Sequence, residues 1–176
     1  MRRCLMALAM TLALSAPALA DDADAMRAAA NGFYGVYKSF HPSDGVPAAA
    51  DRAKYSPFIS PALDSLLQRA AVAEDRFAKA NKNSPPLVEG DLFSSLFEGA
   101  TGLSVGACSG DGASGRCTVN LTYADPGNKP VSWSDTVLLV NTPGGWRVND
   151  IAYGGTWAFG NKGKLSETLN QVIGFQ

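Results

Sequence analysis

The sequence predicts an α+β fold in which helices precede a four-stranded antiparallel sheet. Up to about residue 100 the apolar residues recur at helical spacing, and beyond it they alternate with polar residues at the period of a strand. The segments between the alternating stretches are rich in Gly, Pro, Asn and Asp, as in hairpin turns. A run of helices followed by a run of strands indicates a segregated α+β arrangement.

Residues 1–20 have the three parts of a secretory signal peptide. Two arginines open the chain, an apolar run follows over 5–14, and Ala18-Leu19-Ala20 ends the segment. The apolar run is about ten residues long, well short of the roughly 20 that a membrane-spanning helix needs. We therefore predict cleavage after Ala20, export to the periplasm or beyond, no membrane span, and one α+β domain over 21–176.

The charge and the cysteines restrict the classes of partner. Loss of Arg2 and Arg3 from 15 basic and 16 acidic side chains leaves a net charge of about −3, which makes nucleic acid a poor partner. Cys4 falls in the leader, so Cys108 and Cys117 remain as a pair, and a disulfide is the default in an oxidising compartment. A redox-active or metal-binding pair is the alternative, but the spacing is too long for a redox motif.

Three helical segments are expected before the sheet. An apolar stripe of helical spacing covers 22–40, and Pro42 ends that helix. Ser60-Pro61 suits the N-cap and first turn of a second helix, which runs to about residue 81. The segment 91–97 is expected to add one or two helical turns.

Four strands are expected near 102–108, 115–124, 131–141 and 145–153, joined as an antiparallel meander. A short helix over 165–173 follows them. The predicted core face is the side shared by these residues of the last three strands: Cys117, Val119, Leu121, Tyr123, Trp133, Val137, Leu139, Trp146, Val148 and Ala152.

The first strand conflicts with this phase. Leu103 and Val105 are in phase with each other, but Cys108 is out of phase with them and must reach Cys117. A one-residue bulge near Gly106 would shift Cys108 onto the face of Val105. The sequence therefore predicts a bulge in the first strand.

Three segments carry a family resemblance: 92–99 (LFSSLFEG), 145–151 (GWRVNDI) and 153–160 (YGGTWAFG). They resemble the exported bacterial proteins grouped as domain of unknown function 3828, and the Trp-x-Val-x-Asp-Ile pattern is the most telling part. The resemblance implies a nuclear-transport-factor-2-like (cystatin-like) cone, a curved antiparallel sheet wrapped around helices with a cavity between them. It implies no activity.

Two acidic residues on the expected core face form the first candidate site. If 142–145 is a tight turn, Val137 faces Asp150 and Asp135 faces Ala152, which makes the two carboxylates diagonal neighbours about 7–8 Å apart. Burial and mutual repulsion would raise their pKa values and suit an acid/base pair. The interpretation we favour is that they accept hydrogen bonds from backbone amides or an arginine and serve the scaffold.

Tyr34 and Tyr37 lie on the first helix and could line the mouth of a cavity, but packing is the role we expect for them. His41 is the only histidine and stands next to Pro42 at a helix end, so we expect no catalytic triad. One histidine and a paired set of cysteines leave too few ligands for zinc. We expect no metal and no cofactor.

The loop 154–163 places Trp157 and Phe159 among glycines. Exposed aromatic side chains dominate binding surfaces, so this pattern suits a recognition loop or a lid. The interpretation we favour is that both aromatic side chains fold back and plug the open end of the cone.

Three functional hypotheses follow. The leading one is an exported, non-catalytic binding module for a small apolar ligand, a peptide or another envelope protein, of which an immunity or inhibitor protein is one version. The alternative is a small cone-fold isomerase, dehydratase or hydrolase that uses Asp135 or Asp150 as acid or base. A purely structural envelope protein is the third. An open cavity that exposes both carboxylates would favour an enzyme or ligand binder, whereas a filled core leaves recognition by the surface.

Overall fold

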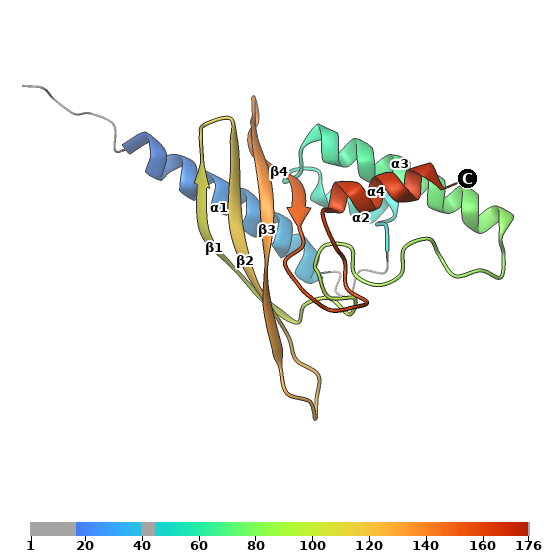
Figure 1. Cartoon of the computed structure of the whole chain (residues 1–176). Coiled ribbons are helices and arrows are strands. Elements are labelled where there is room, and N and C mark those ends of the chain that lie inside the picture. The colour runs from blue at the N-terminus through green and yellow to red at the C-terminus, as the bar shows by residue number, and fades with distance from the viewer. Residues whose placement is uncertain (1–16, 40–44, 176) are drawn as a thin grey trace, which may run out of the picture.

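A computed structural model describes residues 17–39 and 45–175 of the chain. Its elements are α1 (Pro17–Ser39), α2 (Ala49–Tyr55), α3 (Pro61–Ala80), β1 (Gly102–Gly110), β2 (Ser114–Tyr123), β3 (Val131–Thr142), β4 (Gly145–Ala152) and α4 (Leu165–Gly174) (Figure 1). The four strands form one antiparallel sheet in the order β1-β2-β3-β4, which confirms the predicted α+β fold and meander. The apolar run of the leader, Cys4 and His41 lie outside the described residues.

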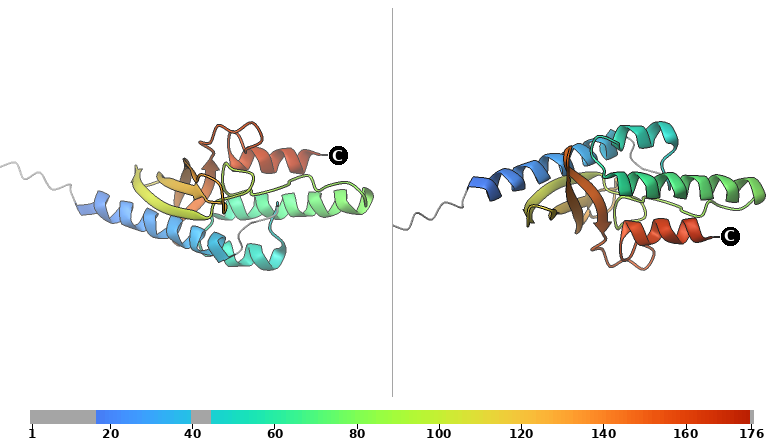
Figure 2. Two further views of the ribbon diagram at one scale, coloured as in Figure 1. Left: turned by 90° about the horizontal axis from the view of Figure 1, so that it is seen from below. Right: turned by 90° about the horizontal axis from the view of Figure 1, so that it is seen from above.

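The longer helices occupy two different positions relative to the sheet. Helix α1 crosses one face, whereas α3 and α4 lie side by side beyond the β4 edge (Figure 2). Helix α3 is fixed there because its entry segment pairs with β4: the amide of Val148 donates to the carbonyl oxygen of Phe58, and the amide of Ser60 donates to that of Val148, each at 2.8 Å. Within the described part of the chain, no helix is apolar over enough length to cross a bilayer.

The predicted start of the second long helix is confirmed. The side chain of Ser60 accepts a hydrogen bond from the backbone N–H of Leu63 at 3.0 Å, and Pro61 is the first helical residue. Helix α1 begins at Pro17, earlier than the expected start. The seven-residue helix α2, which buries Tyr55, was not predicted.

The segment 91–97 is irregular, so the prediction of helical turns there is wrong. Its polar groups are taken by other partners: the carboxylate of Asp91 accepts the N–H of Phe93 at 2.6 Å. The amide of Asn161 donates to the carbonyl oxygens of Asp91 and Ser94, each at 2.7 Å. A helix would need these backbone groups for its own hydrogen bonds.

The bulge predicted in β1 is confirmed. Val105 pairs with Val119 and Cys108 pairs with Cys117, so two residues of β1 lie opposite one residue of β2. The two cysteines form the predicted disulfide across these neighbouring strands, with a Cα–Cα distance of 4.1 Å.

A second bulge, in β4, overturns part of the predicted core face. Leu139 pairs with Val148 as expected, but Leu138 then pairs with Asp150 and Val137 with Ile151. The extra residue turns the buried Ile151 onto the core face where Ala152 was expected. It also places Asp150 on the opposite face of the sheet from Asp135, so the two carboxylates are not diagonal neighbours.

An aromatic cluster fills the space between α1, α2 and the loop before β1. Neighbouring rings lie 5.0 to 5.7 Å apart between centroids. The cluster contains Phe33, Tyr34, Tyr37, Tyr55 and Phe93. Tyr34 and Tyr37 are both 0% exposed, which confirms that they pack in the core and do not line an opening.

Candidate binding site

Asp135 is a buried hydrogen-bond acceptor at the end of the core. Its side chain accepts the backbone N–H of Ser95 at 2.9 Å, the hydroxyl of Ser95, and the N–H of Gly154 at 2.8 Å. The indole Nε1–H of Trp133 adds a fourth donor at 3.2 Å. Asp135 therefore accepts hydrogen bonds from backbone amides, as the favoured interpretation expects.

Asp150 joins β4 to α4. Its carboxylate accepts the backbone N–H and the hydroxyl of Ser166 at 2.9 and 2.6 Å, and the N–H of Ile151 at 2.9 Å. It thereby satisfies a free amide in the first turn of α4, as a capping side chain does. Both predicted acids are scaffold acceptors, and they serve different parts of the fold.

Asp91 is a buried acid that the sequence analysis missed. The hydroxyl of Tyr37 donates to its carboxylate at 2.6 Å and itself accepts the N–H of Ala100 at 2.8 Å. Burial raises the pKa of Asp91 to about 7, although the hydrogen bond from Tyr37 opposes the shift. Asp91 is only 1% exposed, so it fastens its loop to α1 and does not meet solvent.

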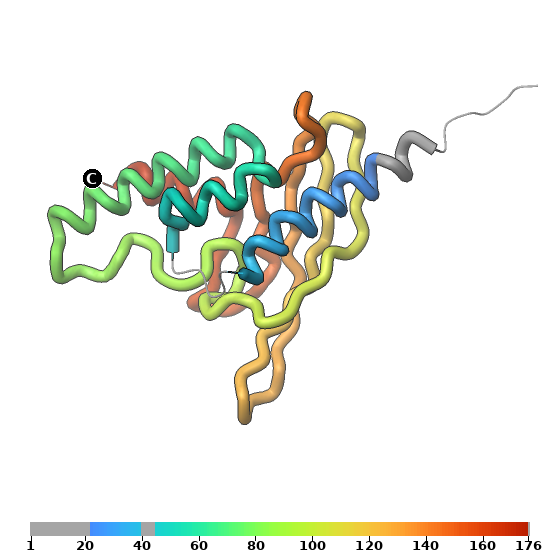
Figure 3. The backbone as a smooth tube through the Cα atoms, turned by 180° about the vertical axis from the view of Figure 1, so that it is seen from behind, coloured from blue at the N-terminus to red at the C-terminus, as the bar shows by residue number. Residues whose placement is uncertain are grey.

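Two loops that are distant in sequence meet at Ser95. The 88–99 loop runs back from α3 past the end of α1 before it enters β1 (Figure 3). The 154–163 loop follows β4. The hydroxyl oxygen of Ser95 accepts the N–H of Gly155 at 2.9 Å, and its carbonyl oxygen accepts the N–H of Asn161 at 2.8 Å. Together with Asp135, these bonds fix both loops to the sheet.

Two glycines allow this close approach. A Cβ at Gly155 would lie 2.4 Å from the ring of Trp157 and 2.6 Å from the Cβ of Ser95, and one at Gly160 would lie 2.5 Å from the carbonyl oxygen of Ser95. Larger residues would separate the two loops. The glycines of the 154–163 loop therefore serve packing.

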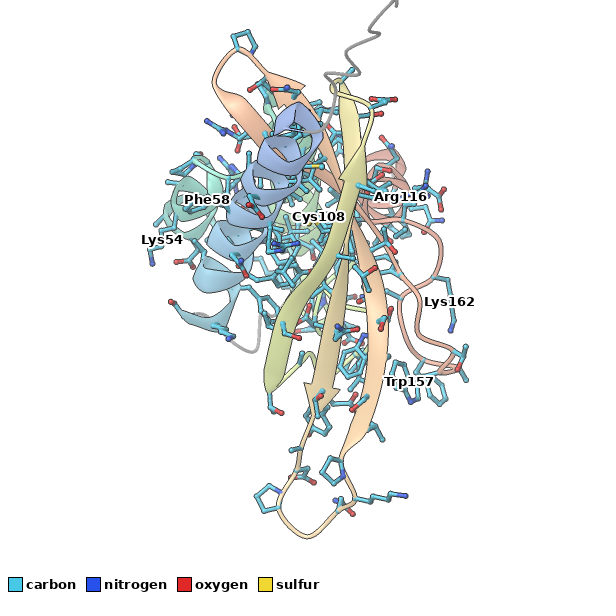
Figure 4. All side chains as sticks on the ribbon, turned by 90° about the vertical axis from the view of Figure 1, so that its left-hand side faces the viewer. Lys54, Phe58, Cys108, Arg116, Trp157 and Lys162 are labelled. Atoms are coloured by element: carbon cyan, nitrogen blue, oxygen red, sulfur yellow. A yellow bond between two sulfur atoms is a disulfide. The ribbon has the colours of Figure 1, made fainter. Side chains whose placement is uncertain are left out.

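Between the two loops lies a pocket of about 470 Å³, called here the aromatic pocket. It is lined by Glu89, Leu96, Phe97, Glu98, Trp157, Phe159 and Gly160. Trp157 packs edge-to-face on Trp133, with ring centroids 5.1 Å apart (Figure 4 shows Trp157 beside the lower part of the sheet). Phe159 is 91% exposed and Phe97 is 42% exposed. The expectation that both loop aromatics fold back is correct for Trp157 and wrong for Phe159.

The structure brings only part of the predicted site together. Trp157 and Phe159 line the aromatic pocket, and Asp135 supports it from behind through Ser95. Tyr37 contributes to the pocket indirectly, because its hydroxyl holds Asp91 in the 88–99 loop. Asp150 lies at the contact between β4 and α4. The 88–99 wall of the pocket was not predicted, although the phenylalanines of the 92–99 segment were a usable signal.

A wider pocket of about 590 Å³ lies along the sheet beside the β1–β2 hairpin. Its lining mixes polar and apolar side chains, among them Arg116, Leu138 and Asn149. None of the residues predicted from the sequence as site residues lines it.

Comparison with known proteins gives little to set beside this geometry. No protein-family model matches the chain, and no curated protein matches it in sequence. A crystal structure of a protein of unknown function from Bacteroides thetaiotaomicron VPI-5482 is similar at 16% identity, with a TM-score of 0.39, over 76% of this chain and 89% of that one.

Proposed function

We propose that the chain is an exported, non-catalytic binding module that holds an apolar group of its partner at the aromatic pocket. The observation that carries the proposal is the exposure of Phe159, whose side chain is 91% accessible on a loop tied down on both sides of it. In this position the large apolar side chain of Phe159 contributes almost no buried surface to the fold. Fixed, exposed aromatic residues are typical binding hot spots because their ordering cost is already met before the partner arrives.

Export is supported by two features. The first 20 residues have the pattern of a signal peptide, and the Cys108–Cys117 disulfide is of a kind that persists mainly in oxidising compartments. The helix-then-sheet order is also compatible with the cone fold of the domain of unknown function 3828 family, and membership of that family is part of the proposal.

The enzyme alternative has less support from the geometry. Asp135 and Asp150 lie on opposite faces of the sheet, and each carboxylate already accepts at least three hydrogen bonds. A general acid or base must reach a substrate proton directly or through one water. Neither carboxylate contributes to the lining of the aromatic pocket.

Site-specific photo-crosslinking tests the proposed function. A benzoylphenylalanine placed at Phe159 of the full chain, expressed in the organism of origin, should give a discrete adduct in the envelope fraction. The matched control carries the same group at Phe175, another exposed phenylalanine at 51% accessibility. Trp157→Ala should remove the adduct at position 159 because it removes a wall of the pocket. Equal labelling at positions 159 and 175 would contradict the proposal.

A further inference from the structure

The aromatic pocket carries two acidic side chains that its apolar lining does not require. Glu89 and Glu98 both line it, and both are exposed. Within the described residues, neither forms an ion pair or a side-chain hydrogen bond. The basic residue of the facing loop, Lys162, directs its Nζ to the carbonyl oxygen of Gly155 at 3.4 Å. Two negative charges without an ion-pair partner among the described residues thus border the exposed rings.

This combination matches an organic cation. The face of an aromatic ring attracts a cation, and a nearby carboxylate adds a direct electrostatic attraction. The aliphatic stem of an arginine or lysine would cover Leu96 and the rings while its charged end stays beside Glu89 or Glu98.

The extent of the apolar surface favours a peptide over a free small ion. Phe97 and Phe159 remain 42% and 91% exposed, so they present apolar surface well outside any volume that a small cation fills. Neighbouring residues of a peptide would cover that surface, and exposed apolar patches of this kind are characteristic of macromolecular interfaces.

We infer that the aromatic pocket binds the cationic side chain of an arginine or lysine within a peptide segment of a partner protein. This inference rests on the proposed binding function: the apolar group held at the pocket is the aliphatic stem of the cationic side chain. The aromatic rings supply the contact with the stem, and Glu89 and Glu98 select the charge.

The test is an NMR titration of the ¹⁵N-labelled chain with capped peptides of the sequence Ala-Leu-Xaa-Leu-Ala. Peptides with Arg or Lys as Xaa should shift the amides of Leu96, Phe159 and Gly160. Peptides with norleucine or Glu as Xaa should bind at least about tenfold more weakly, and about 0.5 M salt should weaken the arginine peptide several-fold because it screens exposed charges. Phe159→Ala should weaken every peptide.

Paired variants separate charge from shape. Glu89→Gln with Glu98→Gln should weaken the arginine peptide about tenfold and leave the norleucine peptide unchanged. The matched control, Asp24→Asn with Asp75→Asn, removes two exposed carboxylates from α1 and α3 and should leave both affinities unchanged.

Three results would overturn the inference. Equal binding of the norleucine and arginine peptides would show an apolar site without charge selection, and would leave the proposed function intact. Equal shifts with tetramethylammonium ion alone, at the same concentration, would identify a free small cation as the occupant. No pocket shift with any peptide would also reject the inference, and the crosslinking at position 159 would then decide the proposed function separately.

Discussion

Asp135 and Ser95 lie 40 residues apart in sequence and are joined by two hydrogen bonds. The backbone N–H of Ser95 donates to Oδ2 at 2.9 Å, and its hydroxyl donates to Oδ1. Oδ1 also accepts the N–H of Gly154 at 2.8 Å, so one carboxylate on β3 holds both walls of the aromatic pocket. The acid that the sequence marked as a possible proton carrier thus positions the two loops of the aromatic pocket.

Asp135→Asn should therefore destabilise the fold and loosen the pocket. In the wild-type protein, N–H donors face both carboxylate oxygens of Asp135. The asparagine side chain must direct its NH₂ group, itself a donor, at some of these donors, and such a mismatched buried group costs about 1–3 kcal/mol. Urea unfolding should show this loss, with altered amide shifts for Gly155 and Gly160. The exposed Asp125→Asn is the control and should leave the midpoint unchanged. An unaltered unfolding curve for Asp135→Asn would contradict the scaffold role.

The stability of the fold should fall as the pH rises toward neutrality, because of Asp91. Its pKa is raised from the ordinary 3.8 to about 7, chiefly by burial, so the native state holds this proton more tightly than the unfolded chain does. The contribution of Asp91 to the free energy of unfolding is fully present below about pH 4 and is lost as the pH rises through about 7. It amounts to roughly a few kcal/mol at most, by the conversion of pKa shifts into free energy.

Asp91→Asn provides the measurement that isolates this group. The amide stays neutral at every pH and can still bond to Tyr37 and Phe93. The difference in unfolding free energy between the two proteins should change progressively between about pH 4 and 7, with the variant gaining relative stability at the upper end. A difference that stays constant over this range would show that Asp91 is ionised throughout. Asp135 and several tyrosines face the same region and are unchanged in the variant.

The Cys108–Cys117 disulfide should contribute only modestly to stability. It closes a loop of short sequence separation, 9 residues, for which loss of chain entropy in the unfolded state gives about 2–3 kcal/mol. The double variant Cys108→Ala with Cys117→Ala should lower the unfolding free energy by about this amount and remain folded, because the β1–β2 ladder is retained. Comparison with the reduced wild-type chain controls for the loss of the sulfur atoms. A variant that no longer folds would contradict this estimate.

The two bulges show how far the sequence could specify the sheet. The bulge in β1 was predictable because Cys108 had to reach Cys117, and a covalent constraint fixes register. The bulge in β4 had no such marker. It lets Asp150 cap α4 while Ile151 enters the core. Both α4 and the core that receives Ile151 lie outside β4, so the sequence of the strand does not reveal the bulge.

The pocket was predictable only on one side. Trp157 and Phe159 among glycines singled out the 154–163 loop, and both residues line the aromatic pocket. The facing wall was taken for helical turns over 91–97. Tertiary hydrogen bonds override that local preference: Asn161 donates to Ser94, and the N–H of Ser95 donates to Asp135. Contacts over such sequence distances are not visible in a local pattern.

Substitution of the two aromatic residues of the 154–163 loop should have different effects on the stability of the fold. Phe159 is 91% exposed, so Phe159→Ala removes little buried surface and should leave the melting temperature within about 1 °C. Trp157 is half-buried against Trp133, and Trp157→Ala should cost about 1–3 kcal/mol, less than truncation of a fully buried tryptophan. Phe175→Ala, which removes a ring that packs edge-to-face on Phe77, is a control for loss of an exposed aromatic residue outside the site.

The difference in stability between the two variants decides how a loss of binding is interpreted. A loss of binding in Phe159→Ala at unchanged melting temperature locates the contact at the ring itself, because the pocket walls remain in place. The same loss in Trp157→Ala combines the contact with a weakened wall. If Phe159→Ala lowered the melting temperature as much as Trp157→Ala, the ring of Phe159 would be packed in solution, and its exposure could no longer support a binding role.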